Sequence, residues 1–120
     1  MIFKTIKEQE FFTTERCHII EILNEDVSTK MSIAQARVEP NVQTQLHALK
    51  GIDESYYILK GKGEMEIDGN ILGIVEVGDV IFIPKGESQR IKNIGDEDLV
   101  FLCICSERFQ ENKYLDLEKM

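Results

Sequence analysis

Apolar and polar residues along this chain alternate over short runs, the period expected of half-buried β-strands. In residues 31–39 the side chains of Ser32, Ala34, Ala36 and Val38 fall on one face. Residues 55–60 are rich in the aromatic and aliphatic types that favour extended structure. The pattern predicts strands at residues 17–23, 31–39, 42–49, 55–60, 64–68, 71–77, 80–83, 89–93 and 99–105.

Turn-forming residues separate the predicted strands at spacings of about ten residues. Pro40–Asn41 fits the centre of a turn, because proline presets the first angle and asparagine tolerates a positive second one. Gly69–Asn70 predicts a hairpin. Residues 1–12 are interpreted as an edge strand or an arm, and the polar tail 106–120 as a helix or a segment lying across a neighbouring subunit. Short strands without a long helix predict an antiparallel sandwich or barrel.

Composition narrows the classes of partner. A chain of 120 residues is about the size of one domain, so residues 1–120 are expected to form a single domain. The net charge of −8 argues against binding a nucleic-acid backbone, which needs clustered Lys and Arg. The longest apolar run, residues 99–105, is far shorter than the ~20 residues of a membrane span. We therefore expect neither nucleic acid nor membrane as a partner.

The cysteines and the amino end indicate the compartment. The three cysteines, Cys17, Cys103 and Cys105, show no disulfide framework spacing and suit a reducing cytoplasm. Charges stand among the first ten residues where a secretory signal would have its apolar segment. A cytoplasmic location is the expectation. Cys103 and Cys105 share one strand face, where small core residues are favoured over a reactive or ligating pair.

Two segments combine glycines with candidate ligands at fixed spacing. In the first, Asn41 is followed after five residues by His47, and Leu49 stands two positions beyond it. Glu54 comes next, and Gly61 follows after six intervening residues. The second segment places turn residues around a glutamine, in the order Gly78, Pro84, Gly86, Gln89 and Asn93.

These two segments resemble the paired motifs of the cupin superfamily, which consists of small jelly-roll barrels. The family has a glycine where Asn41 stands and histidines where Leu49 and Gln89 stand. The resemblance covers residues 31–106 and is carried by turn residues that fall in register across both motifs. It implies an all-β fold, an antiparallel double-stranded β-helix (jelly-roll) cupin barrel with a short N-terminal arm and a C-terminal tail. It also implies a homodimer.

The resemblance further implies a metal site. Cupins usually hold a divalent ion with three histidines and one glutamate, so the ligands here would be His47, Glu54 and Gln89. Gln45 shares the side of its strand with His47 and would serve with Gln89 in ligand binding. Leu49 cannot ligate, and a neutral amide binds softer transition ions poorly, so the site would be open and weak. The expected ion is Zn, Mn, Fe or Ni.

Glu54 and Tyr56 are the candidate catalytic residues. A carboxyl group buried in the barrel without metal would have a raised pKa, which suits Glu54 to general acid or base work. Tyr56 has the same parity and would present its hydroxyl to the pocket, whereas Tyr57 would face the other way. A rim carboxylate paired with Lys50 remains the alternative for Glu54, and a core position is the alternative for Tyr56.

Three functional hypotheses follow. In the first, the cupin binds a small organic acid or sugar derivative, and a weakly held divalent ion acts as a Lewis acid for isomerase, epimerase or lyase-type chemistry. In the second, the barrel is a metal-free module that binds or senses a small molecule, and Leu49 is the residue that favours it. In the third, the barrel serves only in dimerisation.

Overall fold

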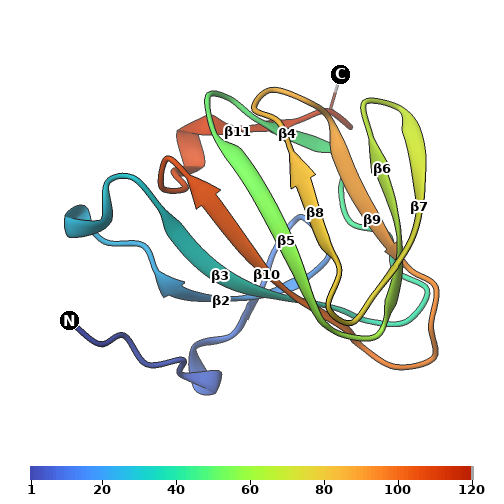
Figure 1. Cartoon of the computed structure of the whole chain (residues 1–120), viewed down its shortest axis with the longest axis horizontal. Coiled ribbons are helices and arrows are strands. Elements are labelled where there is room, and N and C mark those ends of the chain that lie inside the picture. The colour runs from blue at the N-terminus through green and yellow to red at the C-terminus, as the bar shows by residue number, and fades with distance from the viewer. Residues whose placement is uncertain (120) are drawn as a thin grey trace.

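Two antiparallel β-sheets make up the protein in this computed structural model, which describes residues 1–119 (Figure 1). The six-stranded sheet has the order β1-β2-β3-β10-β5-β8, and the five-stranded sheet has the order β11-β4-β9-β6-β7. The strands of the first sheet are β1 (Phe11–Phe12), β2 (His18–Leu23), β3 (Ser32–Val38), β10 (Leu99–Ser106), β5 (Asp53–Lys60) and β8 (Val80–Ile83). Those of the second are β11 (Tyr114–Asp116), β4 (His47–Leu49), β9 (Gln89–Asn93), β6 (Lys62–Ile67) and β7 (Asn70–Glu76).

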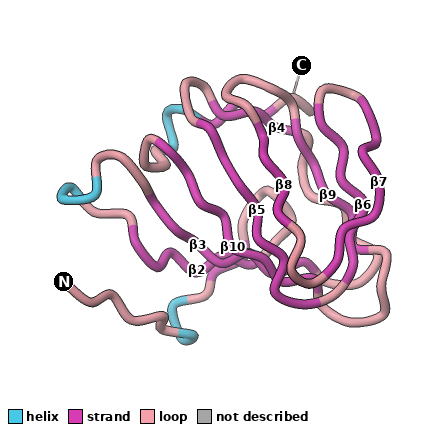
Figure 2. Tube along the Cα trace, viewed as in Figure 1, coloured by secondary structure: helices cyan, strands magenta, loops and turns pink. Residues whose placement is uncertain are grey.

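Strands and their connecting loops account for nearly the whole trace (Figure 2). The helical elements are short 3₁₀ turns at η1 (Lys7–Gln9), η2 (Asp26–Ser28) and η3 (Glu111–Lys113). Within residues 1–119, no helix has the length and apolar character needed to cross a membrane. The predicted all-β jelly-roll barrel with antiparallel strands is confirmed.

The core lies between the two sheets and follows the predicted alternation. Ser32, Ala36 and Val38 of β3 are buried on the inner face, and Tyr57 of β5 is 40% exposed on the outer one, as expected. The side chains most completely enclosed are large and mostly aliphatic: Phe101, Ile58, Met65, Ile83, Ile91 and Leu99. Their removal from water is the main favourable term that holds the sheets together.

The register of β10 sets the positions of the polar residues inside the barrel. β10 pairs with β5 on one side, so Cys105 lies opposite Glu54 and Cys103 lies opposite Tyr56. β10 pairs with β3 on its other side. Because side chains alternate across a strand, all four of these side chains face the interior.

The glycine that closes the first motif is required by both backbone angle and space. Gly61 has φ +84°, which L-residues other than glycine rarely adopt. A Cβ atom at this position would lie 2.7 Å from the carbonyl oxygen of Asp98. The turn between β5 and β6 can therefore approach the start of β10 only when residue 61 is glycine.

One predicted turn is confirmed and one is displaced. Asn41 has φ 67°, as predicted for the second central residue of the Pro40–Asn41 turn. The hairpin between β6 and β7 turns at Asp68–Gly69 rather than at Gly69–Asn70, since Asn70 already pairs with Ile67. Both central residues have positive φ, 52° and 76°, the combination that aspartate followed by glycine tolerates best.

The prediction of a continuous strand over residues 42–49 is wrong. Only His47–Leu49 forms β4, and Gln43 makes an isolated bridge to Lys92. The backbone N–H of Gln45 instead donates to the Glu15 carbonyl over 3.0 Å, and that of Leu46 donates to Glu118 Oε2 over 2.8 Å. Long-range contacts from both ends of the chain thus interrupt the ladder.

The C-terminal tail does not form the helix that was one of the two expectations for it. The described part of the tail contains η3 and then the strand β11, which pairs with β4 of the same chain. Tyr114 lies opposite Leu49, and Asp116 lies opposite His47. The tail therefore covers one end of the barrel, next to the first motif (Figure 1).

Candidate functional site

A cavity of about 370 Å³ lies inside the barrel. The inner faces of β2, β3, β5 and β10 form much of its wall. Residues from the two ends of the chain complete it, among them Phe11 and Glu15 from the N-terminal part and Phe109 and Tyr114 from the tail. The site thus depends on segments that are far apart in the sequence.

Glu54, Gln89 and Tyr56 form a buried hydrogen-bonded chain beside this cavity. Gln89 Nε2 donates to Glu54 Oε1 over 3.0 Å, and the Tyr56 hydroxyl donates to Gln89 Oε1 over 2.5 Å. The second carboxyl oxygen of Glu54 is contacted by Cys105 Sγ at 3.6 Å, and no stronger donor within residues 1–119 reaches it. Both polar ends of the glutamine are therefore satisfied within the protein.

Burial governs the protonation of this chain. Desolvation raises the pKa of Glu54 to about 7, and the hydrogen bonds from Gln89 and Cys105 offset only part of that effect. Desolvation and the nearby Glu54 charge raise the pKa of Tyr56 well above its usual value. At neutral pH Glu54 exchanges a proton readily, whereas Tyr56 keeps its proton. Glu54 has the properties of an acid–base group, and Tyr56 those of an orienting donor.

His47 contributes an open acceptor to the cavity. Its Nδ1 lies 2.7 Å from the backbone carbonyl oxygen of Gln45, so Nδ1 carries the proton and Nε2 has a free lone pair. The ring stacks on Tyr114 with centroids 4.9 Å apart. Burial lowers the pKa of His47 and favours the neutral imidazole.

Glu15 lies near the Nε2 edge of this imidazole. Its Oε1 is 3.7 Å from His47 Nε2, too far for a hydrogen bond. Burial and the Glu54 charge raise the pKa of Glu15 to about 7. However, 26% of the Glu15 side chain is exposed, and solvent there offsets part of the desolvation. The protonation of Glu54, which is 7% exposed, is controlled more firmly by the fold.

The Gln45 side chain is bonded to the C-terminal tail and does not face the cavity. Its amide oxygen accepts a hydrogen bond from the Tyr114 hydroxyl over 2.6 Å, and its side chain does not line the cavity. The interaction attaches the tail to the segment before β4. Gln45 therefore supports His47 and Tyr114 from outside the cavity, and its predicted ligand-binding role stays a prediction.

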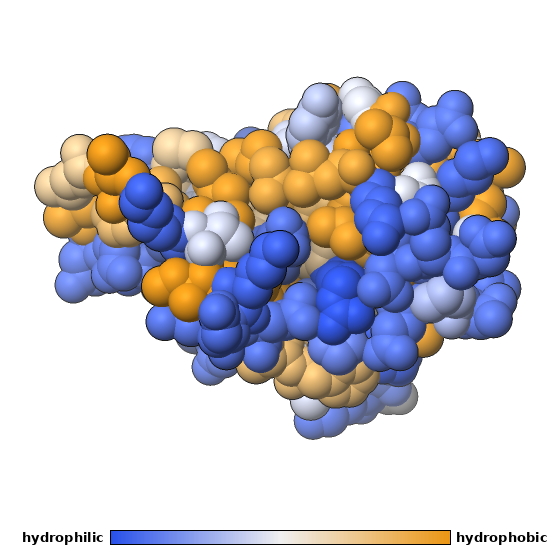
Figure 3. Space-filling view, turned by 90° about the horizontal axis from the view of Figure 1, so that it is seen from below, coloured by the Kyte–Doolittle hydropathy of each residue, from blue (hydrophilic) through white to orange (hydrophobic). Residues whose placement is uncertain are grey.

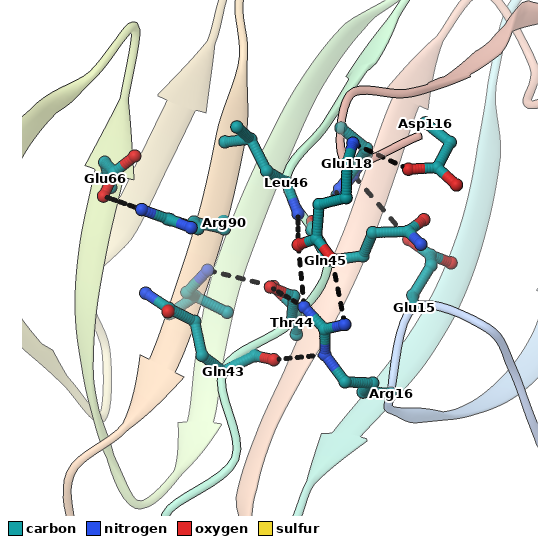
Figure 4. Close-up of polar contacts among 12 residues, drawn as sticks. Glu15, Arg16, Gln43, Thr44, Gln45, Leu46, Glu66, Arg90, Asp116 and Glu118 are labelled. Atoms are coloured by element: carbon teal, nitrogen blue, oxygen red, sulfur yellow. Dashed lines mark hydrogen bonds and ion pairs between the residues drawn. The ribbon is translucent and has the colours of Figure 1, made fainter. Parts of the chain in front are cut away.

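An arginine joins both ends of the chain near Gln45 (Figure 4). The Arg16 guanidinium donates to both carboxylate oxygens of Glu118, over 3.0 and 2.8 Å. Its Nε donates to the carbonyl of Gln43 over 3.0 Å. Because Glu15 precedes Arg16, this bidentate pair also fixes the segment that brings the Glu15 carboxyl group to the cavity.

The donors do not fit a divalent metal. Leu49 lines the cavity at the position where a second histidine is expected, and it offers no ligand atom. The Gln89 amide oxygen already accepts from Tyr56, while its NH₂ group faces Glu54. Within residues 1–119, no cluster of three or more His, Cys, Asp or Glu side chains has a geometry that could hold a metal ion.

The structure nonetheless brings four of the five candidate residues together, and Gln45 is the exception. His47 pairs with Gln89 across β4 and β9, and Gln89 contacts Glu54. His47, Glu54 and Tyr56 line the cavity, and Gln89 lies directly behind Glu54. The alternative of a rim carboxylate paired with Lys50 is wrong, because Glu54 is buried and bonded to Gln89.

Sequence reasoning missed Glu15 and Tyr114. Neither belongs to the two motifs, and both reach the cavity from segments outside residues 31–106. The register of Tyr114 is set by its pairing with Leu49. The only signal for either was residue type, a carboxylate and a tyrosine in polar surroundings, which is common on any protein surface.

Comparison with known proteins gives the family. Residues 34–105 match the model of the cupin domain. An uncharacterized protein of Methanocaldococcus jannaschii is 36% identical over 102 residues, which are 83% of this chain and 80% of that protein. The oxalate decarboxylase of Bacillus subtilis is 33% identical over 116 residues, 92% of this chain, but the chain spans only 29% of that enzyme's length.

A solved structure shows the same fold. The crystal structure of a predicted oxalate decarboxylase from Thermotoga maritima superposes with a TM-score of 0.78 and 26% identity. The likeness covers 89% of this chain and 99% of that one. The motif register, the barrel topology and these similarities lead to one conclusion: the chain belongs to the cupin family.

Proposed function

We propose that this cupin binds a small organic molecule in its barrel cavity without a divalent metal, as a binding or sensing module. The proposal is supported by the residues that stand where the cupin pattern has metal-binding histidines. Leu49 places an apolar side chain where the cupin pattern has a histidine ligand. The amide of Gln89 is hydrogen-bonded at both ends, to Tyr56 through its oxygen and to Glu54 through its nitrogen. What remains accessible is a cavity with polar groups at a few points and apolar walls, as in small-molecule sites.

The metal-dependent alternative is a second candidate. A divalent ion bound through His47, Glu54 and Gln89 would supply Lewis-acid activation for isomerase, epimerase or lyase chemistry on a small acid or sugar derivative. The relatives named as oxalate decarboxylases favour an acid, but the chain spans only 29% of the Bacillus subtilis enzyme, whose activity therefore carries over only as a hypothesis. Binding this ion would require Gln89 to release Tyr56.

Metal analysis of protein purified without an affinity tag tests the choice. We expect sub-stoichiometric Zn, Mn, Fe and Ni, and a melting temperature that does not change on dialysis against EDTA. Stoichiometric metal that is lost in His47→Ala would contradict the module and support the metal-dependent alternative. The same purified protein should be screened for a retained organic molecule by mass spectrometry after denaturation.

A second copy of the chain is the proposed protein partner. Tyr57, Val80 and Phe82 lie exposed on the outer face of β5 and β8, where Tyr57 is paired with Val80. β8 is the edge strand of the six-stranded sheet. Figure 3 shows hydrophobic groups gathered in a band on the face seen from below. Contiguous exposed apolar surface of this kind is typical of interfaces.

Free cysteines at all three positions favour a cytoplasmic setting.

A further inference from the structure

The side chains that line the cavity carry negative but no fixed positive charge. Glu15, Glu21, Glu54 and Glu111 belong to its lining, and no lysine or arginine of residues 1–119 does. Arg16, which follows the lining residue Glu15 in the sequence, donates both of its terminal N–H groups to the Glu118 carboxylate. An organic anion entering this cavity would meet carboxylates without a cation to compensate them, which is electrostatically costly.

Two acceptors at the cavity, one on His47 and one on Glu54, lack a strong donor among the described residues. His47 is 3% exposed, and its Nε2 faces the cavity without a hydrogen-bond partner among the described residues. The outer oxygen of Glu54 has a weak thiol contact from Cys105 and no stronger donor in the described part of the chain. The two tyrosine hydroxyls at the cavity are already donated, that of Tyr56 to Gln89 and that of Tyr114 to Gln45.

Aromatic rings complete the wall around these acceptors. Tyr114 stacks on His47, and Tyr56 packs against Phe101 with ring centroids 4.4 Å apart. Phe11 and Phe109 also line the cavity. Aromatic faces attract cations, and the attraction is strongest where water is excluded.

We propose that the occupant of this cavity carries a protonated amine, which donates hydrogen bonds to Glu54, Glu15 and His47 Nε2, while its apolar body packs on the aromatic wall. An ammonium group supplies the fixed positive charge that the lining lacks, together with three donors for these acceptors. The inference rests on the proposed binding function and names the class of its ligand. It separates this chain from relatives whose names refer to oxalate, a dianion.

The test compares three probes that share one ring and differ in charge. Benzylammonium, benzyl alcohol and benzoate are titrated into the full chain by isothermal calorimetry at pH 7.5, and amide NMR shifts locate the site. We expect benzylammonium to bind at least about tenfold more tightly than benzyl alcohol, since hydrogen bonds to charged groups are worth roughly twice neutral ones. Benzoate is expected not to bind.

The other possible results distinguish a failure of the amine assignment from a failure of the proposed binding function. Equal affinity for benzyl alcohol and benzylammonium, or tighter binding of benzoate, overturns the amine assignment and leaves the binding module. A cavity that takes none of the three probes contradicts the binding module itself. Saturable shifts confined to residues outside the cavity overturn the amine assignment as well.

Charge-removing variants give an independent measurement. Glu15→Gln, at the partly exposed position, is expected to weaken benzylammonium binding about tenfold with little change for benzyl alcohol. Glu54→Gln serves as a second variant if the first folds poorly. Asp96→Asn changes the net charge equally at an exposed position outside the cavity, and it should leave both affinities unchanged. An equal loss in Asp96→Asn would overturn the assignment to the cavity.

Discussion

Gln89 donates its amide N–H to Glu54 over 3.0 Å inside the barrel, which orients a glutamine where the cupin pattern has a metal-binding histidine. A carboxylate only accepts hydrogen bonds, so the NH₂ end of the amide must face Glu54. The oxygen end then accepts from Tyr56. The glutamine is accommodated because both ends of its amide have hydrogen-bond partners, and its N–H group fixes one carboxyl oxygen of Glu54.

We expect Gln89→Leu to destabilise the protein. The change leaves the Tyr56 hydroxyl and one Glu54 oxygen buried without their partner, which costs roughly 2–5 kcal/mol for the two groups. The free energy of unfolding in urea measures the loss. Tyr56→Phe leaves only the Gln89 oxygen unpaired, so its loss should be about half as large. Equal stability of Gln89→Leu and the wild type would contradict the hydrogen-bond chain.

The pKa of Glu54 predicts a pH-dependent stability. An unfolded glutamate titrates near 4.5, and in the fold Glu54 titrates at about 7. The folded state therefore binds the proton more tightly, and stability from this group is fully present below pH 4.5 and is lost as pH rises to about 7. The full loss is on the order of 3 kcal/mol, taken from the pKa difference at ~1.4 kcal/mol per unit.

Glu54→Gln isolates this contribution. Urea melts of both proteins between pH 4.5 and 8 should give a difference in unfolding free energy that changes most between pH 4.5 and about 7 and levels off toward pH 8. The comparison is needed because His47 also titrates. Its pKa is lowered in the fold, so its contribution to the unfolding free energy falls as the solution is acidified, whereas that of Glu54 rises. A difference that stays constant across the range would place Glu54 in contact with solvent.

Restoring the two missing histidines should restore metal binding. Leu49 lines the cavity and Gln89 lies behind Glu54, so Leu49→His combined with Gln89→His adds two imidazoles near His47 and Glu54. We expect the affinity for Mn²⁺ or Zn²⁺ to rise by at least about tenfold, measured by calorimetry. Leu49→His alone should give part of the gain. No gain in either variant would show that position 49 cannot direct a ligand to the site.

The Arg16–Glu118 pair should control opening of the site. Arg16→Ala removes the bidentate contact that joins the N-terminal segment to the tail. Hydrogen exchange at the amides of Gln45 and Leu46, which donate to Glu15 and Glu118, is expected to accelerate. Lys30→Ala, which breaks an exposed pair with Glu107, is the matched control and should leave these amides unaffected. Unchanged exchange in Arg16→Ala would contradict the role of the pair.

The proposed self-association can be tested on β8. Phe82→Asp places a charge within the exposed apolar face of β5 and β8, where Phe82 lies opposite Ser55. We expect it to shift the mass measured by light scattering from that of a dimer to that of a single chain of 13.8 kDa. Val27→Asp, at an exposed position in η2, is the control. A wild-type protein that elutes as a single chain would contradict the dimer.

Local sequence patterns were sufficient for the barrel. The alternation in β3 and the turn residues of both motifs are short-range signals, because strand period and turn angles depend on residues that are close in the chain. The resemblance to the cupin motifs implied that His47, Glu54 and Gln89 lie together, and the structure brings them together. Residue type likewise showed that Leu49 removes a ligand.

Only the tertiary structure decided what closes the cavity. Glu15 and Tyr114 reach it because Arg16 holds Glu118, 102 positions away, and because β11 pairs with β4 across more than 60 positions. Sequence spacing carries no signal for contacts over such separations. The hydrogen bonds of the Gln45 and Leu46 amides to Glu15 and Glu118 likewise limit the expected strand at 42–49 to the short β4. The orientation of Gln89, and with it the open acceptors of His47 and Glu54, follows from which neighbours donate and which accept, and those neighbours are assembled only when the sheets pack.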